Sequence, residues 1–318
     1  MGERSIIERL VSLSNQLPDD IIGPGDDCAA FPFNDVYLLL TSDLMNRTSH
    51  MPYGAFPEEL GRFLMSINLS DIAAMGGNPL GFLTSMSLPA SMEMQFIEDF
   101  QRGLAKASKQ YNCPILGGDT KEGREPVITG TALGTVPKSS ILLRRTSKAG
   151  DLLAITGKLG RAAPWTLLES DNQHNIKLLL DVTARLDAAK VLASLNASTS
   201  CMDCSDGLSA TLEAMQPPGL SFLVNGESIP LHQEAKAVLD KVNDSSKGKK
   251  WDEMALHMGG DYELVFTIHE HDVQELKNEF NDFTLIGEVV KGRQNQVIKD
   301  GRSRVIYNRG YEHLKFRR

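Results

Sequence analysis

Aspartates that stand beside glycine, beside serine or at the end of an apolar run recur along this chain. Carboxylate oxygens are the ligands that Mg²⁺ prefers in proteins, and a protein-bound Mg²⁺ commonly bridges to the phosphates of a substrate. An aspartate beside a glycine is also the ordinary composition of a turn, so no single one of these residues defines a site. Their number is what points to metal-assisted phosphate chemistry. The eight aspartates are Asp26, Asp27, Asp43, Asp71, Asp119, Asp203, Asp206 and Asp261.

Asp71 is the hardest of these aspartates to explain as a turn residue. It lies in the run Asn68-Leu-Ser-Asp-Ile-Ala-Ala-Met75, within a helical pattern of apolar residues that begins at Pro57. An unpaired carboxylate buried among such neighbours is very costly, so we expect a cation beside it. The sequence lacks a set of His and Cys at the spacing of zinc ligands, which favours a hard divalent ion.

The common glycine-rich phosphate-binding motifs are absent from the sequence. It contains no G-x-x-x-x-G-K-[S/T] P-loop, no H-R-D catalytic loop and no G-x-G-x-x-G that opens a helix. If the protein handles a nucleoside triphosphate, the phosphates must therefore be held by metal ions rather than by a glycine-rich loop and its lysine.

Charge and composition exclude several classes of partner. The 318 residues include 33 Lys and Arg against 41 Asp and Glu, a net charge of −8, which argues against nucleic acid or an anionic membrane surface as the partner. No apolar run reaches the 18 uncharged residues of a membrane-spanning helix, and the start MGERSIIERL does not resemble a signal peptide. We therefore expect a cytoplasmic protein.

The four cysteines are Cys28, Cys113, Cys201 and Cys204, of which only the last two form a close C-x-x-C pair. A structural zinc site needs a second pair of Cys or His, which the sequence lacks. Reduced cysteines are the favoured interpretation, and a thioredoxin-like redox site remains the alternative.

The elements that must position the aspartates form two α/β blocks. Apolar spacing predicts helices over residues 5–16, 57–75 and 91–111 and strands over 35–41, 82–88, 113–116 and 127–136. A polar, basic stretch over 137–150 then marks a boundary. Beyond it the same patterns predict strands over 152–156, 222–224, 263–268 and 285–290, helices over 183–195, 208–215, 234–242 and 273–280, and a solvated loop over 243–250. We therefore expect two domains, residues 1–140 and 141–318.

Taken together, the motifs resemble the thiamine-monophosphate kinase family, which belongs to the superfamily of aminoimidazole ribonucleotide synthetase and selenophosphate synthetase. One G-G-D would be weak support, but the matching stretches run in family order over essentially the whole chain. They are Gly25-Asp-Asp27, Thr41-Ser-Asp43, His50, Asn68-Leu-Ser-Asp71 with the following Ile-Ala-Ala-Met-Gly-Gly, Gly117-Gly-Asp119-Thr, Leu143-Arg-Arg145, Lys148-Ala-Gly-Asp151, Met202-Asp-Cys-Ser-Asp206-Gly-Leu, Gly260-Asp-Tyr-Glu-Leu264 and Gly310-Tyr311-Glu-His.

The resemblance implies an aminoimidazole-ribonucleotide-synthetase-like fold, classed as α/β or α+β, whose N-terminal domain binds ATP and Mg²⁺ and dimerises through its sheet. The C-terminal α/β domain would close the active-site cleft. The implied activity is that of a thiamine-phosphate kinase. It transfers the γ-phosphoryl group of ATP to thiamine monophosphate with the help of several Mg²⁺ ions, and forms thiamine diphosphate in the last step of its biosynthesis. Because the acceptor is an ionised phosphate oxygen, no general base is needed.

The resemblance also assigns the site residues. Mg²⁺ would be held, directly or through water, by Asp27, Thr41, Ser42, Asp43, Asp71, Asp119, Asp203 and Asp206. ATP would be contacted by Gly118, Asp119, Arg144 and Ser205, and the thiamine phosphate by His50, Asp261 and Tyr311. The chain departs from many relatives at Gly260, where they carry an acidic residue, and Asp261 or Glu263 is expected to compensate.

Two other functions remain open from the sequence. One is another ATP-using synthetase of the superfamily, whose acceptor pocket would differ at His50, Gly260 and Tyr311. The other is a catalytically silent protein that binds a Mg-nucleotide, although all the motif carboxylates are present. A turnover assay with thiamine monophosphate separates these functions.

Overall fold

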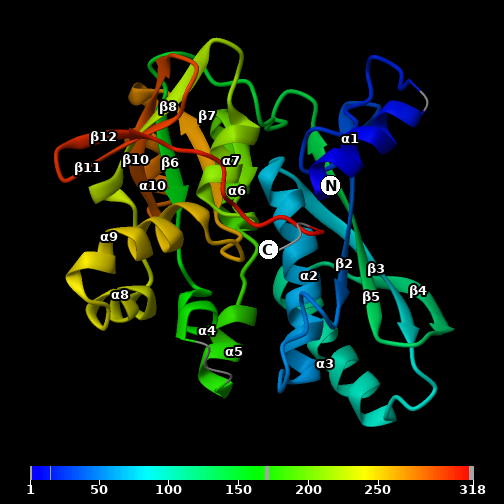
Figure 1. Ribbon diagram of the computed structural model, residues 1–318. Helices are drawn as coiled ribbons and strands as arrows, with labels where there is room; N and C mark the ends of the chain where they lie inside the picture. Colours follow the sequence, from blue (N-terminus) through cyan, green and yellow to red (C-terminus); the bar gives the residue numbers. More distant parts are fainter. Residues whose placement is uncertain (1, 15, 169–171, 315–318) are drawn as a thin grey trace.

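The first lobe of the molecule is built on a five-stranded sheet (Figure 1). The computed structural model describes residues 2–14, 16–168 and 172–314. In spatial order its strands are β1 (Ala29–Phe33), β2 (Val36–Asn46), β5 (Val127–Pro137), β3 (Asn78–Leu88) and β4 (Ile115–Glu122). The strands β3 and β4 run parallel, because α3 (Met94–Tyr111) crosses over between them, and the other neighbouring strands are antiparallel.

Two helices, α2 (Pro57–Ala74) and α3, cover one face of this sheet (Figure 1). Proline at the first turn of α2, followed by Glu58, suits the amino-terminal end of a helix. Nearly all later residues of α2 are buried. Its approach to α3 depends on Gly103, where a Cβ atom would lie 1.9 Å from the carbonyl oxygen of Glu58. This close packing fixes α2 over the inner face of the sheet.

The other face of the same sheet is apolar and exposed. Along β2 the side chains alternate, so that Leu39 and Met45 are buried under α2 whereas Leu40 and Leu44 face outward. A contiguous exposed apolar face of this kind marks an interaction surface. We call it the outer sheet face, and its exposed apolar side chains are Phe31, Phe33, Leu40, Leu44, Leu83 and Leu116.

The second lobe is built on a seven-stranded sheet (Figure 1). Its pairs are antiparallel apart from the parallel pair of β8 and β11. In spatial order the strands are β12 (Arg302–Val305), β11 (Gln296–Lys299), β8 (Leu220–Asn225), β10 (Phe283–Lys291), β6 (Leu152–Thr156), β9 (Leu264–Ile268) and β7 (Ser198–Asp203).

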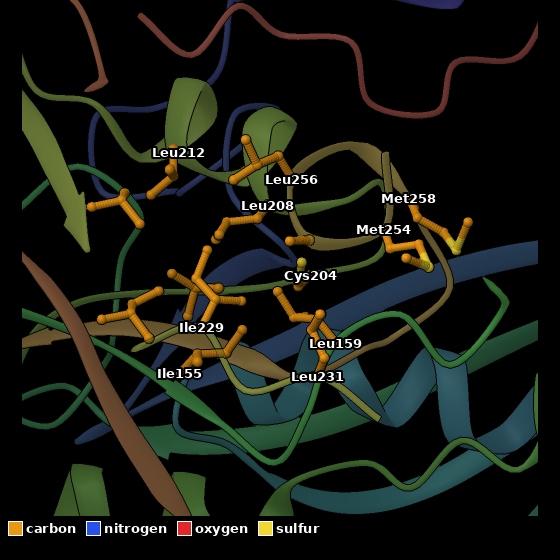
Figure 2. Close-up of a cluster of buried hydrophobic side chains, with 14 of the residues drawn as sticks. Ile155, Leu159, Cys204, Leu208, Leu212, Ile229, Leu231, Met254, Leu256 and Met258 are labelled. Atoms are coloured by element: carbon orange, nitrogen blue, oxygen red, sulfur yellow. The ribbon is translucent and has the colours of Figure 1, made fainter. Parts of the chain in front are cut away.

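Helices cover both faces of the second sheet. On one face, α7 (Leu208–Met215), α8 (Gln233–Asp240) and a π-helical turn (Glu253–His257) enclose a core that Figure 2 shows in close-up. On the other face, α6 (Leu186–Leu195) and α10 (Val273–Glu279) pack against the alternate side chains of the same strands. Short 3₁₀ turns occupy Gly226–Ser228 and Glu270–Asp272.

The core of the first sheet includes residues from two separate parts of the sequence. The first sheet ends at Pro137 and the second begins at Leu152, on either side of the predicted boundary at residue 140. After α4 (Ala163–Leu168), however, α5 (Gln173–Leu180) and the residues that follow return to the first lobe. Ile176, Leu180 and Val182 are buried in the core of the first sheet.

The mixed α/β architecture with two sheets confirms the predicted fold class. The prediction of a loop over 243–250 is wrong, because this segment forms α9 (Asp244–Asp252). Trp251 explains the difference, since it is 9% exposed and its ring lies 4.9 Å from the Lys299 ammonium group. Packing of that ring outweighs the polar sequence around it. The prediction also missed four strands, β1, β7, β11 and β12, each of which has six residues or fewer.

The chain begins with α1 (Glu3–Leu13), which contributes no buried residue to either core. Among the described residues, no helix combines the length and the apolar character needed to cross a bilayer.

Candidate functional site

Two predicted metal ligands, Thr41 and Asp71, meet where β2 passes the last turns of α2. The Thr41 hydroxyl donates to Asp71 Oδ2 at 2.5 Å. Two residues further along the strand, the amide of Asp43 donates to Asn68 Oδ1 at 3.1 Å. The side-chain Nδ2 of Asn68 in turn donates to the backbone carbonyl of Leu64 at 2.8 Å, which fixes the orientation of the Asn68 side chain. This pair of contacts holds the strand and the helix in register, so that Asp43 and Asp71 face the same space.

Arg144 holds Asp27, which lies in the loop before β1. Its Nη2 donates to Asp27 Oδ1 at 2.8 Å and its Nε donates to Asp27 Oδ2 at 3.2 Å. The Asp27 side chain is 1% exposed, so this bidentate ion pair is largely shielded from water. The predicted ATP contact and a predicted metal ligand therefore lie side by side.

A third carboxylate reaches the same place from the second lobe. Asp203 ends β7, and its Oδ2 accepts a hydrogen bond from the Ser70 hydroxyl of α2 at 2.8 Å. One carboxylate oxygen from each of Asp27, Asp71 and Asp203 lies within 4.8 Å of the others. We call these three residues the carboxylate cluster. A loop, a helix and a strand of the two lobes thus converge on one point.

Mutual repulsion in a buried setting makes these carboxylates difficult to ionise together. Burial and the neighbouring carboxylates of Asp43 and Asp203 raise the pKa of Asp71 well above its ordinary value. Burial and the charge of Asp27 raise the pKa of Asp203 to about 8. Burial raises the pKa of Asp43 to about 6, and the charge of Asp206 adds to this increase. Burial likewise raises the pKa of Asp206 to about 6. A divalent cation among these oxygens would remove the repulsion, so the donor set suits Mg²⁺.

Ser205 and Asp206 lie in the turn between β7 and α7. Gly207 in this turn has φ +94°, and a Cβ there would lie 2.7 Å from the carbonyl oxygen of Met258. This position therefore requires glycine. The Ser205 carbonyl accepts from the amide of Gly260 at 2.7 Å. The Asp206 carbonyl accepts from the amide of Tyr311 at 2.9 Å. The turn is therefore held between two distant segments beside the carboxylate cluster.

His50 and Tyr311 come together although they lie near opposite ends of the chain. The ring of His313 is 5.3 Å from the His50 ring and 4.8 Å from the Tyr311 ring, measured between centroids. The contact with Tyr311 is edge to face. Burial and the facing His313 lower the pKa of His50 to about 4, so its imidazole is neutral near pH 7.

Three of the predicted residues lie outside this constellation within one chain. Ser42 points to the outer sheet face, where its hydroxyl donates to the Gly130 carbonyl at 3.0 Å. Gly118 and Asp119 are in the edge strand β4. Across the sheet, Asp43 of β2 pairs with Gly130 of β5, which pairs with Thr84 of β3, which pairs with Gly118 of β4. Gly118 is therefore three strand spacings, about 14 Å, from Asp43.

The carboxylate of Asp119 points to solvent within one chain. Its side chain is 60% exposed and its Oδ1 lies 2.9 Å from the Lys121 ammonium nitrogen. The Lys121 ammonium group and the Thr120 amide donate to this carboxylate and lower its pKa. Asp119 is therefore free of the repulsion that raises the pKa of the buried aspartates.

Asp261 has a different task from the expected substrate contact. It is 1% exposed, and its two oxygens accept from the amides of Gly160 and Arg161, each at 2.9 Å. Glu263 is also committed, since its carboxylate pairs with Arg185 at 2.5 Å and accepts from the Thr156 hydroxyl at 2.7 Å. Both side chains hold the segment before β9 in place, and whether either compensates for the missing acidic residue at Gly260 stays a prediction.

Sequence reasoning missed Tyr262 as a residue of the site. Its backbone has φ +52°, a left-handed conformation that is unusual for a bulky residue. The ring packs edge to face on Phe63 of α2, with 6.0 Å between the centroids. Burial and the carboxylates of Asp43 and Asp203 raise the pKa of its phenol. The stretch Asp-Tyr-Glu-Leu drew attention to the segment, but only the fold shows how the Tyr262 ring packs on Phe63.

The cysteines take no part in a disulfide. All four are buried and free, and burial raises the pKa of the thiols of Cys201 and Cys204 well above the ordinary value. A redox-active cysteine needs a lowered pKa and access to solvent. The thioredoxin-like alternative therefore has no support in this geometry.

Comparison with known proteins shows the family to which the chain is similar. Residues 25–136 match the family described as AIR synthase related protein, N-terminal domain. The thiamine-monophosphate kinase of Pyrococcus horikoshii is 34% identical over 294 residues, which cover 92% of this chain and 91% of that protein. The thiamine-monophosphate kinase of Aquifex aeolicus is 32% identical over 323 residues, which cover 99% and 98%.

A solved structure gives the same result. The structure of AaThiL complexed with AMPPCP and TMP matches with a TM-score of 0.80 and 28% identity, over 98% of this chain and 97% of that one. Identity above 30% over nearly the full length of both chains defines the family. The chain belongs to the thiamine-monophosphate kinase family.

Proposed function

We propose that this chain catalyses the ATP-dependent phosphorylation of thiamine monophosphate to thiamine diphosphate. The observation that carries the proposal is the convergence of Asp27 and Asp71, both partly buried, with the buried Asp203, so that one oxygen of each lies within 4.8 Å of the others, beside Arg144. Divalent cations held by these carboxylates would neutralise two anionic phosphates and allow them to approach each other. The complex of AaThiL with AMPPCP, an ATP analogue, and TMP supports the choice of substrates.

Mg²⁺ fits the donor set as the cofactor. The carboxylate cluster would hold it, and Asp43 and Asp206 would supply further carboxylate oxygens. When bound, Mg²⁺ supplies positive charge that neutralises the phosphoryl oxygens in the transition state. The raised pKa values of Asp71 and Asp203 mean that the metal must displace protons, so binding strengthens as the pH rises.

The side chains of this chain position the two phosphates. Arg144, already held by Asp27, directs its remaining N–H groups to a phosphate oxygen of ATP. At the other end of the site, His50 and Tyr311 hold thiamine monophosphate, and the aromatic face of Tyr311 suits a cationic thiazolium ring. The acceptor oxygen is ionised, so the geometry needs only to bring it in line with the γ-phosphoryl group.

A homodimer formed through the outer sheet face would complete the site. In one chain Gly118 and Asp119 lie far across the sheet from Asp43, on the exposed edge strand β4. A second copy packed on the outer sheet face would cover Leu40, Leu44 and Leu83 and place its own β4 near the first copy's carboxylates. Burial of these apolar side chains supplies the driving force for association.

The deciding experiment is incubation of the purified protein with ATP, Mg²⁺ and thiamine monophosphate, followed by chromatography of thiamine compounds. We expect thiamine diphosphate to accumulate together with an equal amount of ADP. The matched control is Asp71→Asn, which keeps the shape of the side chain. Binding of Mg-ATP without product would favour a silent nucleotide-binding protein, and ATP hydrolysis without thiamine diphosphate would favour another synthetase of the superfamily.

A further inference from the structure

We propose that His313, whose backbone is clamped by the amino-terminal helix α1, is a positioning residue for the thiamine-phosphate end of the site. The proposal rests on the function proposed above and extends it to a residue and a helix outside the predicted site. It makes α1, which contributes nothing to either core, part of substrate binding.

The His313 side chain lies between two residues assigned to substrate binding. Its ring is 5.3 Å from that of His50, which follows β2 of the first lobe. On its other side it meets the Tyr311 ring at 4.8 Å and 88°, with 3.3 Å between Nδ1 and the Tyr311 hydroxyl. One imidazole thus determines how the aromatic ring of the second lobe faces the histidine of the first.

The backbone of His313 is fixed from the other end of the chain. The amide of Glu3 donates to the His313 carbonyl at 3.2 Å, and the His313 amide donates to Glu3 Oε2 at 3.0 Å. Next to this pair, Arg4 donates to Glu213 of α7 at 3.0 Å, which ties the start of α1 to the second lobe. The first amides of a helix have no partner within it, and the carboxy-terminal segment accepts from two of them here, those of Glu3 and Arg4.

These contacts place Tyr311 between two anchors. On one side its own amide donates to the Asp206 carbonyl at 2.9 Å, and on the other side stand His313 and Glu3. From the end of β12 to Leu314, the last residue that the structure describes, the segment that carries Tyr311 forms no helix or strand, so without the second anchor it would sample many conformations. The cost of ordering it would then fall on substrate binding. Loss of the clamp should therefore weaken binding of thiamine monophosphate and leave ATP binding unchanged.

Steady-state kinetics of three variants test the proposal. We expect Glu3→Ala and His313→Ala each to raise KM for thiamine monophosphate about fivefold or more, with kcat and KM for ATP within about twofold of wild type. His313→Phe keeps a ring between the two neighbours and should recover most of the affinity. Glu8→Ala, an exposed change in the same helix, is the matched control and should leave KM unchanged.

The double variant sharpens the test. Because Glu3 acts through His313, the Glu3→Ala change should have a smaller effect in the His313→Ala background than in wild type. Independent, multiplying effects would mean that Glu3 does not act through His313. Equal losses for ATP and thiamine monophosphate would mean that both residues only stabilise the fold, which circular dichroism and thermal unfolding of each variant would reveal.

Hydrogen exchange separates failure of this inference from failure of the proposed function. We expect the amides of Tyr311 and His313 to exchange faster in Glu3→Ala than in Glu8→Ala, whatever the substrate of the protein is. Unchanged exchange would overturn the clamp. Faster exchange in a protein that forms no thiamine diphosphate would uphold the clamp, reject the proposed function and, with it, the assignment of His313 to a thiamine-phosphate site.

Discussion

The Ser70 hydroxyl of α2 donates a hydrogen bond to Asp203 at the end of β7, with 2.8 Å between the two oxygens. Ser70 belongs to the first lobe and Asp203 to the second, and both are buried. The residue after Ser70 is Asp71, so this contact sets the distance between two members of the carboxylate cluster. The lobes are therefore joined at the place where the metal is expected to bind.

Ser70→Ala should destabilise the protein and loosen the site. Removing the donor leaves a buried carboxylate oxygen without its partner, at a cost of about 1–3 kcal/mol in the free energy of unfolding. We expect a lower Tm and a higher Mg²⁺ concentration for half-maximal activity. Ser91→Ala, an exposed change after β3, serves as control for thermal unfolding and Mg²⁺ titration. An unchanged Tm would show that the hydroxyl is not needed to hold Asp203.

Asp71→Asn should lower kcat by about 100-fold or more, because a contact made through a metal contributes several kcal/mol to transition-state stabilisation. The fold should survive, since Asn keeps the shape of the side chain and its oxygen can still accept the hydrogen bond from the Thr41 hydroxyl. Asp99→Asn on the exposed side of α3 is the control. A folded Asp71→Asn protein with near-normal kcat would assign this carboxylate a structural task only.

The resemblance to the family placed Asp71 with Asp27 and Asp203 as metal ligands, whereas local patterns alone could not. Pro57 and the apolar spacing after it predict a helix that the structure has, and Asp71 stands among the buried residues of its last turns. Asp27 and Asp203 come from a loop and from a strand of the other sheet. Their convergence depends on how the lobes pack, and no local pattern encodes that packing.

Asp261 shows the opposite case. Its sequence neighbours placed it with the substrate, but its partners are the amides of Gly160 and Arg161, about 100 residues earlier in the chain. Tyr262 is its counterpart, since its left-handed backbone turns the ring toward Phe63 and the carboxylates. A backbone conformation of this kind is fixed by the fold around it, so residue type alone could not reveal it.

The stability of the metal-free protein should fall as the pH rises from about 4 to about 8. The folded protein holds a proton on Asp203 up to a pKa of about 8, whereas the unfolded chain loses it near 3.8. Between these values the folded state binds more protons, so raising the pH favours unfolding. Added Mg²⁺ should replace the protons and reduce this fall. Thermal unfolding from pH 5 to pH 8, with Mg²⁺ and with excess chelator, measures both effects, and a metal-free Tm that rises over this range would contradict the raised pKa.

Leu83→Lys should convert the protein to a monomer and abolish most of its activity. Leu83 is 42% exposed on the outer sheet face, so the change costs the isolated chain little, but it would bury a charge in the proposed dimer. Met94→Lys replaces an apolar residue that is 66% exposed at the start of α3 and should leave the dimer intact. Sedimentation velocity of both variants gives the oligomeric state. A wild-type protein that sediments as a monomer would remove the proposed interface.

Mixing two inactive variants tests whether each site draws on both copies. Asp119→Asn disables the residue on β4 and Asp71→Asn disables the carboxylate cluster, and the two side chains are far apart within one chain. If Asp119 of one copy serves the cluster of the other, a mixed dimer has one site with both defects and one site with none. Random exchange of equal amounts makes half of the dimers mixed, so about a quarter of the wild-type activity should return. Activity that stays at the level of the separate variants, although mass spectrometry shows that subunits have exchanged, would mean that each chain builds its site alone. Asp119 would then have to reach the cluster by a movement of β4 within its own lobe.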